Sequence, residues 1–271
     1  MKRIVLFLLI VLGGFFQLKG QEVNTSVERV YVVFKTHLDV GFTDLSSVVT
    51  QRYITEFIPK ALEVSEKLRA ENASEKYVWT TGAWLIWKYL HTASPQEVER
   101  LEAAIRRGDI VWNSVPYTVE SESMNLDLFE TCLLLSHKLD EKYGKKTIAA
   151  KMTDVPGHTR SIVAPMSRAG IRFLHIGVNP ACPIPSVLEF CRWKDTDGSE
   201  LILVYQQDYG SENVLPGGKS VISINFTGDN HGPHSYEKVK AIYADLHKRY
   251  PKARLIASSF NEIAEELITM Q

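Results

Sequence analysis

The chain has 271 residues, of which 45% are hydrophobic, 10% aromatic and 23% charged. These are ordinary values for a globular protein, and they exclude a disordered polymer, a collagen-like repeat and a low-complexity scaffold. With 31 basic and 32 acidic residues the formal net charge is -1, so the composition gives no electrostatic reason to expect binding to nucleic acid or to an anionic membrane surface.

The first twenty residues have the pattern of a secretory signal peptide. Lys2 and Arg3 precede an unbroken apolar run over residues 4–16, and small and polar residues follow. The run is short for a membrane-spanning helix, which needs about 20 residues, so a membrane anchor is the weaker interpretation. We therefore expect residues 1–20 to be removed, leaving a secreted or periplasmic domain over residues 21–271 that has no membrane contact.

The three cysteines form no CxxC motif, which excludes a thiolate zinc knuckle and a thioredoxin-type redox site. They are Cys132, Cys182 and Cys191. In an oxidising compartment Cys182 and Cys191 are able to pair across a predicted hairpin, which leaves Cys132 unpaired. Three buried thiols are at least as good an interpretation, so both alternatives stay open.

Predicted strands and helices alternate along the chain. Seven short runs rich in β-branched and aromatic residues predict strands, and most are separated by segments with helical spacing of apolar residues. The predicted strands are Val30–Phe34, Tyr77–Thr80, Ile110–Trp112, Ile148–Met152, Arg172–Ile176, Val221–Phe226 and Arg254–Ala257. Two further runs, Leu188–Trp193 and Leu201–Tyr205, flank Asp197-Gly198 and predict a tight hairpin. The alternation predicts an α/β fold with a parallel sheet and helices outside, either closed into a barrel or left open.

Sequence signals also mark several helix ends. Ser259 and Glu262 have the spacing of a capping box for the last helix. Ser235 is predicted to cap the helix that begins just after it and continues through Leu246. Gly108 and Gly144 each follow a run with helical spacing, so they are predicted to end two helices.

Polar clusters follow three separate predicted strands. They lie at residues 36–42, 153–159 and 228–234, and each contains Asp and His beside glycine. Glycine lets the backbone approach a ligand closely. Because the chemistry of parallel α/β folds collects at the carboxyl ends of strands, we expect the three clusters to meet at one end of the sheet.

The first two clusters contain candidate metal ligands. His37 and Asp39 share a face in an extended chain, so one imidazole nitrogen and one carboxylate oxygen can bind the same ion, and zinc suits such ligands. Asp154 is the third candidate. The alternatives are a surface turn for the His37-x-Asp39 motif and a turn cap beside Gly157 for Asp154.

The third cluster and the rest of the second contain further candidates. Asp229 is a candidate general acid, and the alternative is an Asx turn with Gly228. His231 and His234 are either metal ligands or exposed loop residues. His158 either contacts one of the ligand residues without binding the metal itself, or only packs within its own loop.

Two of these clusters resemble motifs of glycoside hydrolase family 38, the class II α-mannosidases. The segment from His37 to Thr43 is similar to the family's opening His-x-Asp-x-Gly-Trp motif. The segment from Asp154 to Thr159 resembles its Asp-x-Phe-Gly-His-Ser segment, and residues 228–234 resemble a glycine- and aspartate-rich loop of some members. The resemblance covers most of the chain after residue 20. It extends only over the family's amino-terminal catalytic domain, so it implies a seven-stranded parallel β/α barrel, (β/α)7.

The sequence also departs from the family pattern. Phe42 stands where tryptophan is usual, and Pro156 stands where phenylalanine is usual. A further zinc-binding histidine of the family has no clear match before Gln271, nor do its helical and β-sandwich domains. The resemblance therefore leaves two alternatives, a fragment or a diverged member in which His231 replaces the missing ligand.

The resemblance implies a retaining glycoside hydrolase that cleaves α-mannosidic bonds with one Zn²⁺ ion. Such enzymes use two carboxyl groups roughly 5–5.5 Å apart. The motif match makes Asp154 the nucleophile, and Asp229 is the candidate acid/base. The candidate ligands of the ion are His37, Asp39, Asp154 and His231. Candidate platforms for a sugar ring are Trp84, Trp112 and Trp193, although large aromatic residues are usually buried.

Two other functions suit the same residues. A zinc-dependent polysaccharide deacetylase also has Asp and His ligands on a related barrel, but it usually has a His-x-x-x-His pair, whereas His231 and His234 are three residues apart. A carbohydrate-binding domain without turnover is the other alternative. If His37, Asp39 and Asp154 are the only family-matched ligands, we expect zinc to be readily chelated and hydrolysis to be weak.

Overall fold

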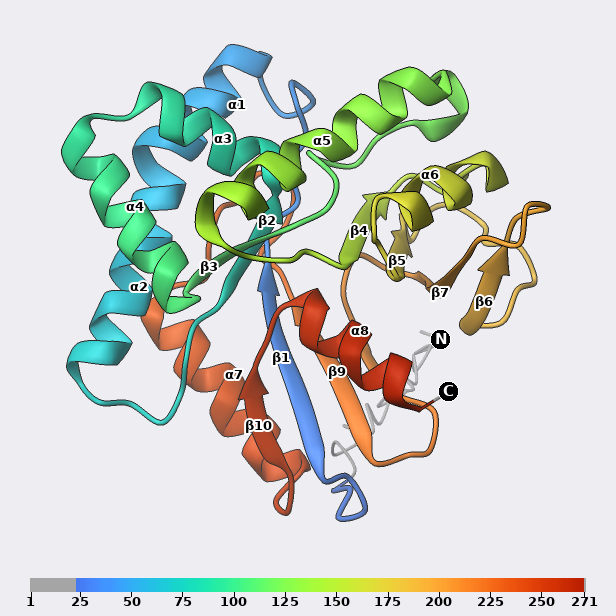
Figure 1. Cartoon of the computed structure of the whole chain (residues 1–271). Helices are drawn as coiled ribbons and strands as arrows, with labels where there is room; N and C mark the ends of the chain where they lie inside the picture. Colours follow the sequence, from blue (N-terminus) through green and yellow to red (C-terminus); the bar gives the residue numbers. More distant parts are fainter. Residues whose placement is uncertain (1–22, 271) are drawn as a thin grey trace, which may run out of the picture.

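Strands and helices alternate through residues 23–270, the part of the chain that the computed structural model describes (Figure 1). The expected signal peptide, residues 1–20, lies outside the described residues. The elements in chain order are β1 (Arg29–Lys35), α1 (Ser46–Arg52), the π-helix η1 (Tyr53–Phe57), α2 (Ile58–Ala70), β2 (Trp79–Gly82), α3 (Ala83–Thr92), α4 (Pro95–Arg107), β3 (Ile110–Asn113), the 3₁₀ helix η2 (Ser121–Ser123), α5 (Leu126–Tyr143), β4 (Ala149–Asp154), the 3₁₀ helix η3 (Arg160–Ile162), α6 (Val163–Arg168), β5 (Phe173–Val178), β6 (Phe190–Lys194), β7 (Glu200–Gln207), β8 (Glu212–Val214), β9 (Ser220–Asn225), α7 (Tyr236–Arg249), β10 (Arg254–Ala257) and α8 (Phe260–Thr269).

The strands form two sheets. The six-stranded sheet has the order β3-β2-β1-β9-β8, and β10 pairs with the first half of β1. The four-stranded sheet has the order β4-β5-β7-β6. The pairings are parallel except for β8 with β9 and β6 with β7. The α/β class with parallel strands is thus confirmed. The expected seven-stranded barrel is not formed as one closed ladder by the described strands, because they are divided between these two sheets.

The predicted hairpin contributes a strand to the parallel arrangement. All seven predicted strands are present, as β1, β2, β3, β4, β5, β9 and β10. The hairpin strand β7 also pairs in parallel with β5, from Phe173↔Ile202 to Val178↔Gln207. Several apolar residues of β7 are buried, among them Leu201 and Val204. This strand lies inside the sheet, between β5 and β6, whereas β6 forms the edge. The assignment of this segment to a hairpin alone was therefore incomplete.

The two sheets enclose a common interior. Between β3 and β4, the backbone N–H and the hydroxyl of Ser114 both donate to the carbonyl of Ala149, each at 2.9 Å. Across the interior, Lys35 Nζ on β1 lies 3.4 Å from Thr153 Oγ1 on β4. The carboxyl ends of β1 and β4 therefore open toward the same space.

Helices cover the outside of both sheets, and α8 packs against their inner faces. In Figure 1, α2, α3 and α4 gather on one side of the molecule and the β6–β7 hairpin lies on the other. The largest core cluster joins β1 and β2 to α2, α3, α4 and α7, and another joins both sheets through Phe260 and Ile263 of α8. None of the helices within residues 23–270 combines the length and the apolar character needed to cross a bilayer.

The predicted helix ends are confirmed. Ser259 and Glu262 form the capping box of α8, and Ser235 accepts a hydrogen bond from the backbone of α7. Gly108 and Gly144 end α4 and α5 in the left-handed conformation, with φ of 81° and 60°, which glycine adopts without steric cost. The three cysteines are unpaired in this structure and only partly buried, so neither a Cys182–Cys191 pair nor three fully buried thiols are seen.

Candidate active site

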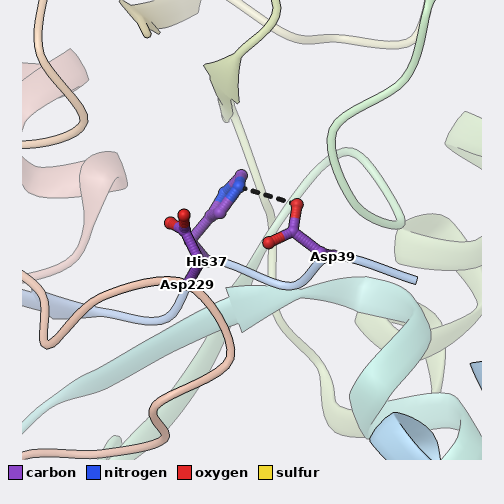
Figure 2. A group of neighbouring side chains, drawn as sticks. All are labelled: His37, Asp39 and Asp229. Carbon is purple, nitrogen blue, oxygen red and sulfur yellow. Dashed lines mark ion pairs between the residues drawn. The ribbon is translucent and has the colours of Figure 1, made fainter. Parts of the chain in front are cut away.

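His37, Asp39 and Asp229 converge at the carboxyl ends of β1 and β9 (Figure 2). One ligand atom of each residue lies within 4.8 Å of the other two. The two strands are parallel neighbours, paired from Arg29↔Ser220 to Phe34↔Asn225. Because parallel neighbours end at the same edge of a sheet, the loops that follow them bring these side chains together.

Asn230 holds the two loops of this cluster in register. Its backbone N–H donates to His37 O at 3.1 Å. Its side chain accepts a hydrogen bond from the N–H of Asp39 and donates one to the carbonyl of Asp39, both at 3.0 Å. Asn230 adopts a φ of 53°, a left-handed conformation that asparagine tolerates better than most residues. Asn230 is not among the residues predicted from the sequence, although an asparagine next to Gly228-Asp229 is a recognisable turn signal.

The charges in the cluster suit a divalent cation. His37 Nε2 lies 3.1 Å from Asp39 Oδ1. The second oxygen, Asp39 Oδ2, is buried and has no hydrogen-bond partner within residues 23–270. A buried carboxylate oxygen is costly unless a donor or a cation satisfies it. One imidazole nitrogen and two carboxylates are a donor set that zinc accepts, so the residues fit the metal that the motif resemblance implies.

Asp154 lies beside this cluster and is not part of it. It ends β4 with a φ of 83°, which is uncommon for a residue other than glycine. Its Oδ1 accepts hydrogen bonds from Asn179 Nδ2 at 2.8 Å and from the hydroxyl of Tyr209. The ring of Tyr209 packs against the ring of His37, with centroids 5.0 Å apart. Tyr209 therefore lies between Asp154 and the imidazole.

Tyr209 is the common neighbour of all three carboxylates. Burial, the hydrogen bond to Asp154 and the negative charges of Asp154, Asp229 and Asp39 raise the pKa of Tyr209 well above its ordinary value. The phenol therefore stays protonated and acts as a hydrogen-bond donor to Asp154. Neither Tyr209 nor Asn179 is among the residues predicted from the sequence. Asn179 directly follows β5 and Tyr209 is the second residue after β7, but β7 was expected to form only a hairpin.

The structure places His231 and His158 outside the cluster. His231 is exposed, and its Nδ1 lies 3.2 Å from the carbonyl oxygen of Thr227. His158 Nδ1 lies 3.1 Å from Ser121 Oγ. Burial lowers the pKa of His158 to about 4, so this imidazole is neutral at pH 7. It holds the loop after β4 against the segment around η2.

His234 is a core residue. It is 3% exposed and packs edge-on against the ring of Phe34, with centroids 5.2 Å apart. Burial, with a smaller contribution from Lys238, lowers its pKa to about 4. Its place beneath the third polar loop suits packing rather than metal binding.

An aromatic pocket of about 350 Å³ adjoins the interior of the site. Trp84 and Trp87 of α3 line one wall and Tyr117 lines another. Pro116 and Tyr117 also line the cavity beneath His37. Of the three tryptophans proposed as sugar platforms, only Trp84 lies at this pocket.

The other two proposed platforms lie elsewhere. Trp112 is 5% exposed, and its indole N–H donates to Asp140 at 3.0 Å, so it belongs to the core. Trp193 lies on β6 and packs against the core of the four-stranded sheet.

The fold is similar to that of several solved proteins. An alpha-mannosidase from Enterococcus faecalis V583 aligns with a TM-score of 0.70 and 17% identity, over 90% of this chain and 29% of that chain. A protein in glycosyl hydrolase family 38 from Enterococcus faecalis aligns with a TM-score of 0.61 and 13% identity, over 90% and 28%. A protein from Mycobacterium smegmatis, assigned as a polysaccharide deacetylase, aligns with a TM-score of 0.56 and 9% identity, over 90% and 91%.

These likenesses concern the fold. The chain spans less than a third of the length of the alpha-mannosidase and about nine-tenths of the length of the deacetylase. No sequence-family model and no curated protein matches the chain. The α/β arrangement of parallel strands is thus shared with these three proteins.

Proposed function

We propose that the protein is a metal-dependent glycoside hydrolase that acts on α-mannosidic bonds. The observation that carries the proposal is the convergence of His37, Asp39 and Asp229 at the end of the interior where Asp154 also lies. The fold shared with an alpha-mannosidase and the motif resemblance to family 38 support the sugar chemistry.

His37 and Asp39 would hold the divalent cation. A bound cation supplies Lewis acidity and a grip on sugar hydroxyls. The buried, unpartnered Oδ2 of Asp39 is the atom of this chain that most needs such a partner. Asn230 fixes the backbone of Asp39, so the carboxylate is oriented before any ligand binds.

Asp154 and Asp229 are the two carboxyl groups that a retaining hydrolysis requires. Both of the described hydrogen bonds to Asp154 fall on Oδ1, which leaves Oδ2 as the attacking atom. Asp154 would bond to the anomeric carbon while the bond to the leaving oxygen breaks, and Asp229 would give that oxygen its proton. Asp229 would then take a proton from the water that cleaves the ester.

The aromatic pocket extends this proposal to the rest of the substrate. An exposed indole face is a suitable platform for a sugar ring because the ring's C–H groups pack on it. Trp84 and Trp87 are half-buried and line this pocket, and Tyr117 lines both the pocket and the interior cavity. We assign this pocket to a sugar unit beyond the bond that is cleaved.

A specific observation favours one second candidate, a metal-dependent deacetylase. The chain matches nearly the full length of a protein assigned that activity. Asp229 also lies near enough to His37 and Asp39 to be a third metal ligand, in which case Asp154 would act as a general base. The two functions thus assign different roles to Asp229.

Hydrolysis of an aryl α-mannoside by the full chain, with chelator and then with added Zn²⁺, tests the first function. Acetate release from an acetylated oligosaccharide tests the second. Asp229→Asn separates them. Retained metal and a glycosyl azide product in the presence of azide support the acid/base role, whereas lost metal supports the ligand role. Activity on the mannoside that is unaffected by Asp154→Asn would contradict the proposed hydrolase.

A further inference from the structure

Two lysines are buried in the interior beneath the candidate site. Lys35 of β1 is 2% exposed and Lys151 of β4 is 5% exposed. Lys35 Nζ lies 3.4 Å from Thr153 Oγ1, and Lys151 Nζ donates to the carbonyl of Met152 at 2.9 Å. An ammonium group has three N–H donors, so each lysine retains donors that these contacts do not use.

No carboxylate pairs directly with either ammonium group within residues 23–270. The charges of Asp208 and Asp229 reach Lys35, and that of Asp208 reaches Lys151, only as longer-range attractions. Each lysine in turn lies near the other, since the charge of Lys35 disfavours the charged form of Lys151. The interior therefore holds two lysine amino groups that have no close carboxylate partner among the described residues; Lys35 Nζ also lies 4.5 Å from the centroid of the Phe226 ring.

Both lysines line the same small cavity, of about 30 Å³. Its wall includes Thr80 of β2 and Asn113 of β3, so four strands from both sheets surround it. The hydroxyl of Thr80 is buried and has no hydrogen-bond partner within the described residues. None of the aspartates and glutamates within residues 23–270 lines this cavity. The volume suits a single water molecule or one small ion.

Burial of unpaired ammonium groups is costly, and two responses can relieve it. Burial lowers the pKa of Lys35 to about 7, and burial together with the charge of Lys35 lowers the pKa of Lys151 well below its ordinary value. One response is therefore the loss of a proton. The other is an anion in the cavity. Two lysines with unused donors and a threonine with an unpartnered hydroxyl line one cavity whose described lining holds no carboxylate, and this arrangement favours the anion.

We propose that this cavity binds a small monovalent anion, such as chloride, between Lys35 Nζ and Lys151 Nζ, with the hydroxyl of Thr80 as a further donor. The anion is a structural counter-ion that holds β1, β2 and β4 around the interior. His37 also lines this cavity, so the anion would be a second ion that neighbours the cation proposed for His37 and Asp39. The inference does not rest on the proposed hydrolase activity.

A bromide soak of crystals of the full chain tests the site directly, because bromide replaces chloride and scatters anomalously. We expect an anomalous peak between the two Nζ atoms. A cavity with no peak, occupied by water alone, would overturn the proposal. This measurement needs no variant, so it decides the question even if a lysine substitution prevents folding.

Thermal unfolding supplies a second readout in solution. With chelator present and ionic strength held constant with gluconate, raising chloride from about 5 to about 200 mM should raise the melting temperature of the full chain by roughly 2–4 °C. Lys151→Met and Thr80→Val should abolish or reduce that rise, whereas Lys138→Met, at an exposed position, should keep it. A halide-independent melting temperature in the unsubstituted chain would contradict the site.

Discussion

The two sheets contribute different parts of the candidate site. The six-stranded sheet supplies His37, Asp39 and Asp229, the side chains that suit a cation. The four-stranded sheet supplies Asp154 at the end of β4, held by Asn179 and Tyr209. The contact between the rings of His37 and Tyr209 joins them. Metal binding and nucleophilic attack should therefore be separable by mutation, because the proposed ligands His37 and Asp39 follow a strand of the six-stranded sheet and the proposed nucleophile Asp154 ends a strand of the other.

The largest expected effect follows from Asp154→Asn, on the four-stranded side. A neutral amide has the size of the carboxylate but is a poor nucleophile, so hydrolysis should fall by at least about a thousandfold. Metal content and melting temperature should stay close to those of the unsubstituted protein. Steady-state kinetics and metal analysis of one preparation check both points. Near-normal hydrolysis would mean that Asp154 only shapes the turn after β4.

The next effect concerns the six-stranded side. His37→Ala and Asp39→Asn each remove one donor from the cluster, so metal affinity should fall by roughly 10- to 100-fold or more. Asn179→Ala, on the other sheet, is the matched control and should retain the metal. Dialysis against a mild chelator followed by elemental analysis measures this. Equal metal loss in all three variants would contradict the proposal that the metal ligands belong to the six-stranded side alone.

A third prediction concerns pH and compares one histidine from each side, the half-buried His158 and the buried His234. The pKa of His158, after β4, and that of His234, after β9, are both lowered to about 4. The unfolded chain therefore binds more protons than the folded chain between pH 6.5 and 4, so stability should fall as the pH falls through this range. Each histidine should contribute a loss of up to about 2 kcal/mol by pH 5.

Urea unfolding at pH 7 and pH 5 measures this loss. His158→Gln and His234→Gln should each reduce the difference in unfolding free energy between the two pH values. A difference that neither substitution changes would show that both imidazoles titrate normally in the folded protein.

The smallest effect is expected at the aromatic pocket. Trp84→Ala should raise KM for a mannose disaccharide or trisaccharide by a few-fold, about 1 kcal/mol of lost stacking, and leave KM for an aryl monosaccharide unchanged. Trp193→Phe, on β6, is the control and should change neither value. An equal rise for both substrates would place Trp84 at the cleaved sugar instead of beyond it.

Much of this arrangement is predictable from sequence where the signal is local. The proximity of His37 and Asp39, the seven strands and the capping box at Ser259 each depend on residues close together in the chain, so their patterns predict them correctly. No local sequence pattern predicts that the strands are divided between two sheets. Whether neighbouring strands form a continuous ladder depends on contacts such as Ser114 with Ala149, which no periodicity encodes.

The same reasoning explains which site residues were missed. Tyr209 and Asn179 touch Asp154 only because β7 and β5 lie side by side in the sheet. The Asp197-Gly198 turn predicts the antiparallel partner of β7 but not its parallel one. Lys35 and Lys151 belong to the strand pattern of β1 and β4, and only the structure shows that both point into one interior.

The most direct test of the account is the position of a zinc ion in crystals of the full chain, found by anomalous scattering at the zinc edge. We expect one ion within about 2–2.2 Å of His37 Nε2 and an oxygen of Asp39, with the hydroxyl of Tyr209 still bonded to Asp154 beside it. Zinc bound only elsewhere, or no zinc at a saturating concentration while His37 and Asp39 keep their present contact, would contradict the central claim that this cluster is a metal centre.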